Sequence, residues 1–275
     1  MIDLQQPFES SYDQVTQALK KVLEEQLQRK KIPDHPKAND LFFDALEADT
    51  NDETFDLLCE VIDLDPAHID AQLARLDFLD LEPEQEITLL EPLIQLAAKR
   101  LGSQTFKKCQ GNFWLIGETR PYMRVKQHLA ICYQELGQVD KAIAEWEEML
   151  KLNPIDNQGA RYELLPISLQ LGRIDESQQL LDAFDEVDSS VIFSWCQVLC
   201  FFVLDDLKVA MSAAERAQTQ NPHMRSYLIG TKRIPKNPPG SYDPGSLEEA
   251  KCFAAPLVAA WKAHPKSRKW LRELS

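Results

Sequence analysis

The chain contains little glycine and has an excess of acidic over basic side chains. Only 9 of its 275 residues are glycine, whereas leucine, alanine, glutamate and glutamine are frequent, a composition that favours helices over sheets. Lysine and arginine number 30 against 44 aspartates and glutamates, which gives a net charge of −14 at pH 7. Such an acidic protein repels the phosphates of nucleic acids and anionic lipids, and the basic stretches at 29–31 and 266–269 are too short to reverse this. We therefore expect no nucleic-acid and no membrane partner.

The sequence also lacks paired cysteines and a long apolar run. Its six cysteines form no CxxC pair and no framework typical of a secreted domain, and most lie among apolar neighbours, where cysteine packs as a small hydrophobic residue. The start of the chain lacks the basic end and the apolar stretch of a signal peptide. The longest apolar run, 191–204, is too short for a membrane-spanning helix and is typical of a buried one. These absences predict a cytoplasmic protein.

Sequence motifs of catalysis and cofactor binding are missing as well. The chain contains no HExxH, no nucleophile elbow and no phosphate-cradling loop. Its five histidines are scattered, and no two of them stand at metal-ligand spacing. The sequence therefore predicts a non-enzymatic protein with no catalytic residues, no metal and no cofactor. One enzymatic alternative stays open at the corner 109–128, a hydrolase or transferase with Cys109, Glu118 and His128 as nucleophile, acid and base.

What the sequence does contain is an internal repeat, clearest at 123–156. Its spacing of small, aromatic and turn residues resembles the tetratricopeptide repeat, a 34-residue pair of antiparallel helices. The positions that carry this resemblance are Ala130, Tyr133, Gly137, Ala142, Trp146 and Pro154. Gly137 supplies the left-handed backbone that ends the first helix, and Pro154 stops the second. Two positions depart from the family pattern: Lys126 stands where the family often has Trp, and Met149 stands in place of the usual Ala.

The pattern recurs along the chain. Gly172 follows Gly137 by 35 residues, and Pro222 follows Pro154 by 68, twice the repeat length. With Ser177, Ala210 and Ala217 at the small positions, these intervals predict two further helix pairs, over 158–190 and 191–224.

Helices are also predicted on either side of the repeats. Upstream, helices are expected over 41–48, 52–64, 67–80 and 84–100, the first two of which form a degenerate repeat closed by Pro66. Downstream, a loop rich in Pro and Gly at 230–246 precedes a helix with a capping box from Ser246 to Glu249 and a kink or restart at Pro256.

The expected fold is an all-α solenoid, a right-handed superhelix of helical hairpins with a C-terminal helical cap. It divides into an N-terminal helical segment with one degenerate repeat (1–110), three tetratricopeptide-like repeats (111–224), and the loop with its capping helices (225–275).

Four segments together resemble one particular family. They are GNFWLIGETRPYMRV at 111–125, LNPIDNQGARY at 152–162, NPHMRSYLIGTK at 221–232 and EEAKCFAAPLVAAWKAHPKSRKWL at 248–271. In this order they are similar to the repeat domain of the suppression-of-tumorigenicity-seven family and its bacterial tetratricopeptide relatives, over residues 40–275. The resemblance implies an α-helical interaction scaffold and brings no catalytic residues with it.

In proteins of this kind, the first helix of each repeat lines a concave groove. The resemblance then places Arg124, Gln127, Ile131 and Gln134 of one repeat, and Tyr162 of the next, toward a bound partner. Arg120, Arg124 and Arg161 would form a cationic spot for a carboxylate or phosphate on an extended peptide. The alternative is that each arginine caps a helix or pairs with a nearby glutamate.

Two further positions leave alternatives open. In the segment 111–125, we expect Phe113 and Trp114 to wedge between the upstream helices and the repeat at 123–156, with Pro121 starting the next helix. Asn157 is either a helix N-cap or a contact to a ligand backbone.

The leading functional hypothesis is a non-enzymatic scaffold that binds a protein or peptide through the concave face of the repeat array. The alternative is a self-associating structural or accessory subunit, a homo-oligomer assembled through exposed apolar helices.

Overall fold

The computed structural model describes residues 6–30, 32, 35–184 and 190–274, and in these the regular structure is helical with no β-strand. The chain divides into two compact units, Met1–Gln158 and Gly159–Ser275. This boundary lies between the first and second predicted repeats, whereas the sequence suggested divisions at 110 and 224. Among the described residues, no helix is both long enough and apolar enough to cross a membrane.

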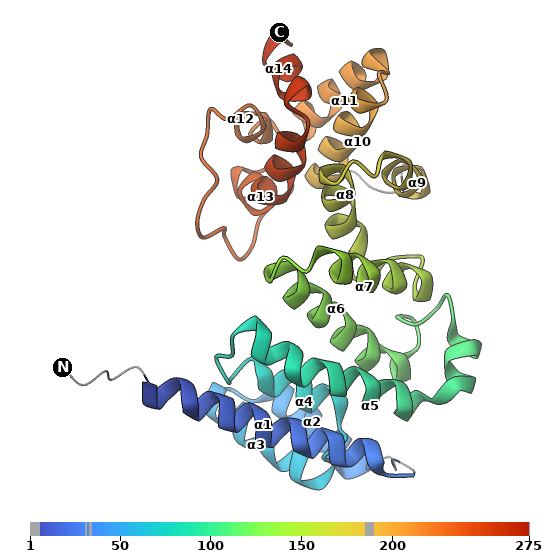
Figure 1. The fold of residues 1–275 in the computed structure, drawn as a ribbon, viewed down its shortest axis with the longest axis vertical. Coiled ribbons are helices and arrows are strands. Elements are labelled where there is room, and N and C mark those ends of the chain that lie inside the picture. Colours follow the sequence, from blue (N-terminus) through green and yellow to red (C-terminus); the bar gives the residue numbers. More distant parts are fainter. Residues whose placement is uncertain (1–5, 31, 33–34, 185–189, 275) are drawn as a thin grey trace, which may run out of the picture. The chain divides into compact units, whose positions relative to one another are not determined.

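The first unit is built around a long helix, α5, which packs against α1 and α6 (Figure 1). Helices α2 and α3 form one hairpin, and α6 and α7 form another. Leucines of α5 and apolar residues of the α2–α3 hairpin are buried in its interior. The elements of this unit are α1 (Gln6–Gln28), α2 (Pro36–Glu47), α3 (Asn51–Leu64), α4 (Ile69–Leu76), α5 (Pro83–Cys109), the 3-10 turn η1 (Gly117–Thr119), α6 (Arg120–Glu135) and α7 (Val139–Leu152).

The second unit is organised around the apolar helix α10, which packs against α8, α9, α11, α13 and α14. Trp195 of α10 and Trp261 of α13 are fully buried and meet edge to face, with ring centroids 5.9 Å apart. Cys196 and Cys200 are buried on the same helix, as expected for a core helix. The elements of this unit are α8 (Ala160–Gln170), α9 (Ile174–Phe184), α10 (Val191–Val203), α11 (Leu207–Gln220), α12 (Met224–Leu228), α13 (Leu247–Ala263) and α14 (Pro265–Glu273).

The three predicted helix pairs are confirmed as α6/α7, α8/α9 and α10/α11, and their turns share one geometry. The residue with a left-handed backbone is Gly137 (φ 67°) in α6/α7, Gly172 (φ 73°) in α8/α9 and Asp205 (φ 63°) in α10/α11. In each case its N–H donates to the carbonyl three positions back, and the next N–H donates to the carbonyl five positions back, at 2.8–3.1 Å. Aspartate tolerates the left-handed backbone better than most residues, so the third turn forms without the glycine on which the sequence pattern depends.

A buried Asx residue before proline ends the second helix of several pairs. Asp65, Asn153 and Asn221 are at most 7 % exposed and stand before Pro66, Pro154 and Pro222. The N–H of each Asx donates to the carbonyl four positions earlier, at 2.8–3.0 Å. The proline that follows cannot continue the helix, so the same short motif sets the same corner in both units.

The ends of the helices before α6 differ from the sequence prediction. Helix α2 begins at Pro36 rather than 41, because the Nδ1 atom of His35 accepts the N–H of Ala38 and caps it. Helix α4 is shorter than 67–80, and Asp80 beyond it has a positive φ of 46°. Helix α5 runs past 100 to Cys109, with a non-helical break at Gly102.

Three expectations about helix ends are corrected or refined. Asn157 does not cap α8: its Oδ1 accepts from Asn153 Nδ2 at 3.2 Å, and Gly159, with φ 75°, is the N-cap. Ser246 caps α13, but the Glu249 carboxylate binds Asn221 Nδ2 at 2.9 Å and the Gly245 N–H at 2.7 Å, which ties the cap to the preceding corner. Helix α13 also continues through Pro256 without a restart.

Candidate binding groove

A groove lies in the first unit between α2, α4, α5, η1 and the start of α6; we call it the α2–α6 groove. It consists of two adjoining hollows of about 540 and 780 Å³. Both hollows are lined by Asn39, His68, Asp70 and Gly117. The groove therefore joins the α2–α3 hairpin, the segment after α5, and the first predicted repeat.

One wall of the larger hollow is apolar and belongs to α2 and α4. Phe42, Phe43 and Leu46 line it from α2, and Leu73 and Ala74 line it from α4. Phe43 is 63 % exposed and Leu46 is 61 % exposed, although each could contribute about 2 kcal/mol if buried. Two large apolar side chains three positions apart on one helix face thus stand in solvent beside a hollow.

Two arginines line the same hollow. Arg124 of α6 makes a bidentate ion pair with Asp70 of α4, with Nε–Oδ1 at 2.8 Å and Nη2–Oδ2 at 2.5 Å. The Nε of Arg120 donates to the carbonyl of Trp114 at 2.7 Å, and its guanidinium lies 5.7 Å from the centre of that indole ring. The arginines are thus held in place by the segment before α6 and by α4.

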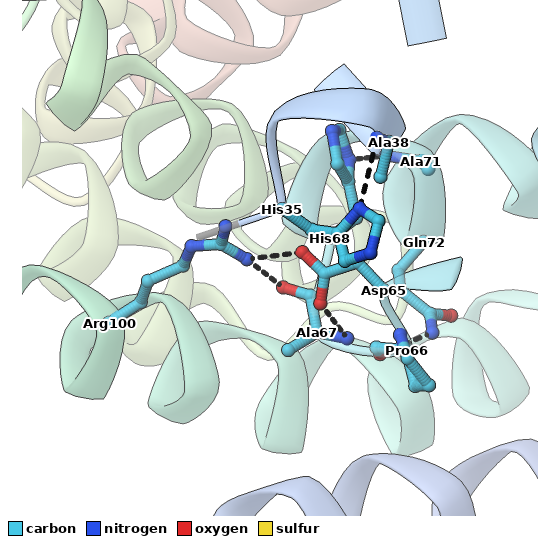
Figure 2. A network of polar contacts seen from close by, with 9 residues as sticks. All are labelled: His35, Ala38, Asp65, Pro66, Ala67, His68, Ala71, Gln72 and Arg100. Carbon is cyan, nitrogen blue, oxygen red and sulfur yellow. Dashed lines mark hydrogen bonds and ion pairs between the residues drawn. The ribbon is translucent and has the colours of Figure 1, made fainter. Parts of the chain in front are cut away.

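Arg100 and His68, which line the smaller hollow, belong to a polar network that Figure 2 shows. Arg100 Nη1 donates to Asp65 Oδ2 and to the Ala67 carbonyl, both at 2.9 Å. The Nδ1 atom of His68 accepts the Ala71 N–H at 3.1 Å and caps α4. Burial lowers the pKa of His68, which keeps the ring neutral and its Nδ1 able to accept.

The residues predicted to face a partner from α6 are partly engaged within the protein. Gln127 Oε1 accepts from Gln158 Nε2 at 2.8 Å, and Gln134 Oε1 accepts from Trp146 Nε1 at 3.3 Å. These two glutamines therefore join α6 to the end of the unit and to α7. Ile131 is 42 % exposed, and Arg120 and Arg124 line the groove.

Arg161 and Tyr162 belong to the second unit. The Arg161 guanidinium lies 4.2 Å from the centre of the Tyr162 ring and 4.7 Å from that of Phe184, and its Nη2 donates to the Tyr162 hydroxyl at 2.6 Å. A cationic spot that combines Arg161 with Arg120 and Arg124 spans both units and stays a prediction.

The corner before α6 has a structural role. Phe113 is fully buried between Phe106 and Tyr122, with ring centroids 5.1 and 6.1 Å away, and its N–H donates to the Leu152 carbonyl at 3.1 Å. Phe113 thus forms the predicted wedge. Trp114 is only half-buried, and the Arg120 guanidinium lies over its ring. Pro121 lies in the first turn of α6, as expected.

The tertiary structure gives His128 partners that the sequence did not suggest. Its Nε2 lies 2.7 Å from Oε2 of Glu86 in α5, and the Cys132 thiol donates to the same oxygen at 3.0 Å. The hydrogen bond to Glu86 raises the pKa of His128, and burial raises the pKa of the Cys132 thiol. Cys109, which the sequence offered as a nucleophile beside His128, is not part of this cluster and is buried at the end of α5. The sequence did contain one signal of this cluster, because His128 and Cys132 lie one helical turn apart. A search for metal-ligand spacing between histidines alone overlooks this pair.

No model of a known protein family matches this sequence. No curated protein matches it either. The functional proposal therefore depends on the groove.

Proposed function

We propose that the chain is a non-enzymatic binding module that takes a segment of a partner protein in the α2–α6 groove. The observation that carries this proposal is that one hollow is lined both by the solvent-exposed apolar residues Phe43 and Leu46 and by Arg120 and Arg124. Exposed apolar side chains beside a hollow are typical of binding surfaces.

The chemistry of this lining defines the partner segment. The apolar wall suits one or two large apolar side chains, and the arginines suit a carboxylate next to them. Asp70 accepts two of the five N–H donors of Arg124, so the guanidinium retains donors for a carboxylate of the partner. The proposed ligand is therefore a peptide segment that combines apolar and acidic residues.

The same proposal includes a tetratricopeptide-like architecture, with the helix pairs stacked as a right-handed superhelix and a likeness to the suppression-of-tumorigenicity-seven repeat domain. Supporting it are the three matching turns at Gly137, Gly172 and Asp205. The Asx–Pro corners at 153–154 and 221–222 recur at twice the repeat length. Such arrays commonly bind extended segments of other proteins.

The proposal can be tested by selecting binders from a displayed library of random peptides. Peptides enriched on the wild-type protein should share an apolar residue next to an acidic one. The double variant Phe43→Ser, Leu46→Ser should bind them at least about 30-fold more weakly, since losing even one of the two contacts costs about 2 kcal/mol. Titration calorimetry with one enriched peptide gives the ratio of affinities.

The matched control is Ile155→Ser. Ile155 belongs to the same unit, is 58 % exposed and does not line the groove, so its variant should bind like the wild type. No enrichment, or equal affinity of the double variant, would overturn the proposal. If light scattering instead shows a dimer that Phe43→Ser, Leu46→Ser dissociates, the groove serves self-association and the alternative replaces it.

A further inference from the structure

A cluster of three possible metal ligands joins α5 to α6 beside the α2–α6 groove. Its members are Glu86 from the first turn of α5, and His128 and Cys132 from successive turns of α6. One ligand atom of each residue, Oε2, Nε2 and Sγ, lies within 4.8 Å of the other two. Cys132 is buried, and Glu86 and His128 are half-buried.

These distances suit a small tetrahedral cation. Zinc binds imidazole nitrogen and carboxylate oxygen at about 2.0–2.2 Å and thiolate sulfur at about 2.3 Å, which separates ligand atoms by roughly 3.3–3.8 Å. The Glu86–His128 and Glu86–Cys132 distances are 2.7 and 3.0 Å. A cation could therefore enter if the Glu86 carboxylate moved away from His128 and from Cys132 by less than about 1 Å.

The chemistry of the set selects among cations. One thiolate, one imidazole and one carboxylate favour zinc or cobalt over magnesium or calcium, which prefer oxygen ligands alone. Two more carboxylates act electrostatically on His128, Asp77 from the end of α4 and Glu135 from the end of α6. This negative surrounding favours the binding of a divalent cation.

We propose that Glu86, His128 and Cys132 bind one zinc ion, which links α5 to α6 beside the α2–α6 groove. His128 and Asp77 line the larger hollow, so the cluster borders the α2–α6 groove. Binding displaces the thiol proton of Cys132, and also a proton from the His128 ring when that ring is charged. The site does not depend on the partner-binding proposal.

Cobalt(II) titration of the reduced, chelator-treated protein tests the site. We expect one cobalt per chain with an intense thiolate-to-cobalt charge-transfer band, which one equivalent of zinc abolishes. Cys132→Ser should remove this band, and Glu86→Gln and His128→Gln should weaken cobalt binding at least tenfold. Melting curves of the variants without metal establish that each is folded.

The controls are the other thiols of the first unit. Cys59→Ser and Cys109→Ser should keep the band, because these residues lie outside the cluster. The proposal is overturned if the wild type shows no stoichiometric band, if the band persists in Cys132→Ser, or if folded Glu86→Gln and His128→Gln bind cobalt as tightly as the wild type. If Cys132→Ser does not fold, the last criterion decides.

Discussion

Aromatic rings join helices in both units, and in the first unit ion pairs between helices stand beside them. In the first unit, ion pairs connect separate helices: Arg124 with Asp70, Arg100 with Asp65, and His128 with Glu86. In the second, the helices around α10 meet through aromatic rings, Trp195 against Trp261 and Phe202 against Trp270 at 5.0 Å. Four of these side chains, Arg100, Asp70, Arg124 and His128, also line the α2–α6 groove.

The contrast between ion pairs and aromatic packing also appears at Lys126, within the predicted repeat at 123–156. It stands where tetratricopeptide repeats often have Trp, is 2 % exposed, and pairs with Glu145 and Glu148 of α7. Its ammonium also lies 5.7 Å from the centre of the Tyr122 ring. The long apolar stem fills space as an aromatic ring would, while the charge is satisfied by two carboxylates. At this position an ion-pair network therefore joins α6 to α7.

The largest effect is expected from a substitution that removes the aromatic contact at the centre of the second unit. Trp195→Ala should lower the free energy of unfolding of that unit by about 3–5 kcal/mol, because it leaves a cavity beside Trp261. Hydrogen exchange followed by mass spectrometry should show faster exchange throughout 190–274. The control Leu207→Ala, at a 45 % exposed position of the same unit, should change little. Equal protection in Trp195→Ala and wild type would refute the central role of this contact.

A smaller effect is expected on the pH dependence of stability, and it arises from His68 in the first unit. Burial lowers the pKa of His68 below its ordinary value of 6.5, so the unfolded chain takes up a proton more readily than the folded one. The contribution of His68 to stability is therefore complete above pH 6.5 and is lost as the pH falls below that value. Protonation also removes the Nδ1 lone pair that caps α4.

The comparison of wild type with His68→Asn isolates this dependence. Asparagine caps helices without titrating, and Asp65, Asp70, Arg100 and Phe42 around position 68 are present in both proteins. His128, whose pKa is raised by Glu86, contributes with the opposite sign and cancels in the difference. Urea unfolding between pH 7.5 and 5 should show that the wild type loses more stability than His68→Asn. Parallel curves would contradict the assignment.

The smallest expected effect tests the equivalence of the turns. Asp205 adopts φ 63° where the other two pairs have glycine, so Asp205→Gly should raise the free energy of unfolding by about 0.5 kcal/mol. The reciprocal change Gly172→Asp should lower it by about 1 kcal/mol. Thermal unfolding of both variants measures the two signs, and a stabilising Gly172→Asp would show that the turns are not equivalent.

The sequence by itself determined the helical class, the three helix pairs and the corners between them. These features depend on contacts between residues at most five positions apart, such as the turn bonds at Gly137 and Gly172 and the corners before Pro154 and Pro222. Local spacing therefore carries the information, and the departures at Asn157 and at the ends of α4 and α5 lie where competing local hydrogen bonds or a backbone break decide the boundary.

Only the tertiary structure decided the groove and the cluster beside it. Asp70 meets Arg124 across 54 residues of sequence, and Glu86 meets His128 across 42. No periodicity specifies such pairs, because their positions follow from how α4 and α5 pack against α6. The same packing leaves Phe43 and Leu46 in solvent, a fact that an apolar pattern on a helix cannot distinguish from burial.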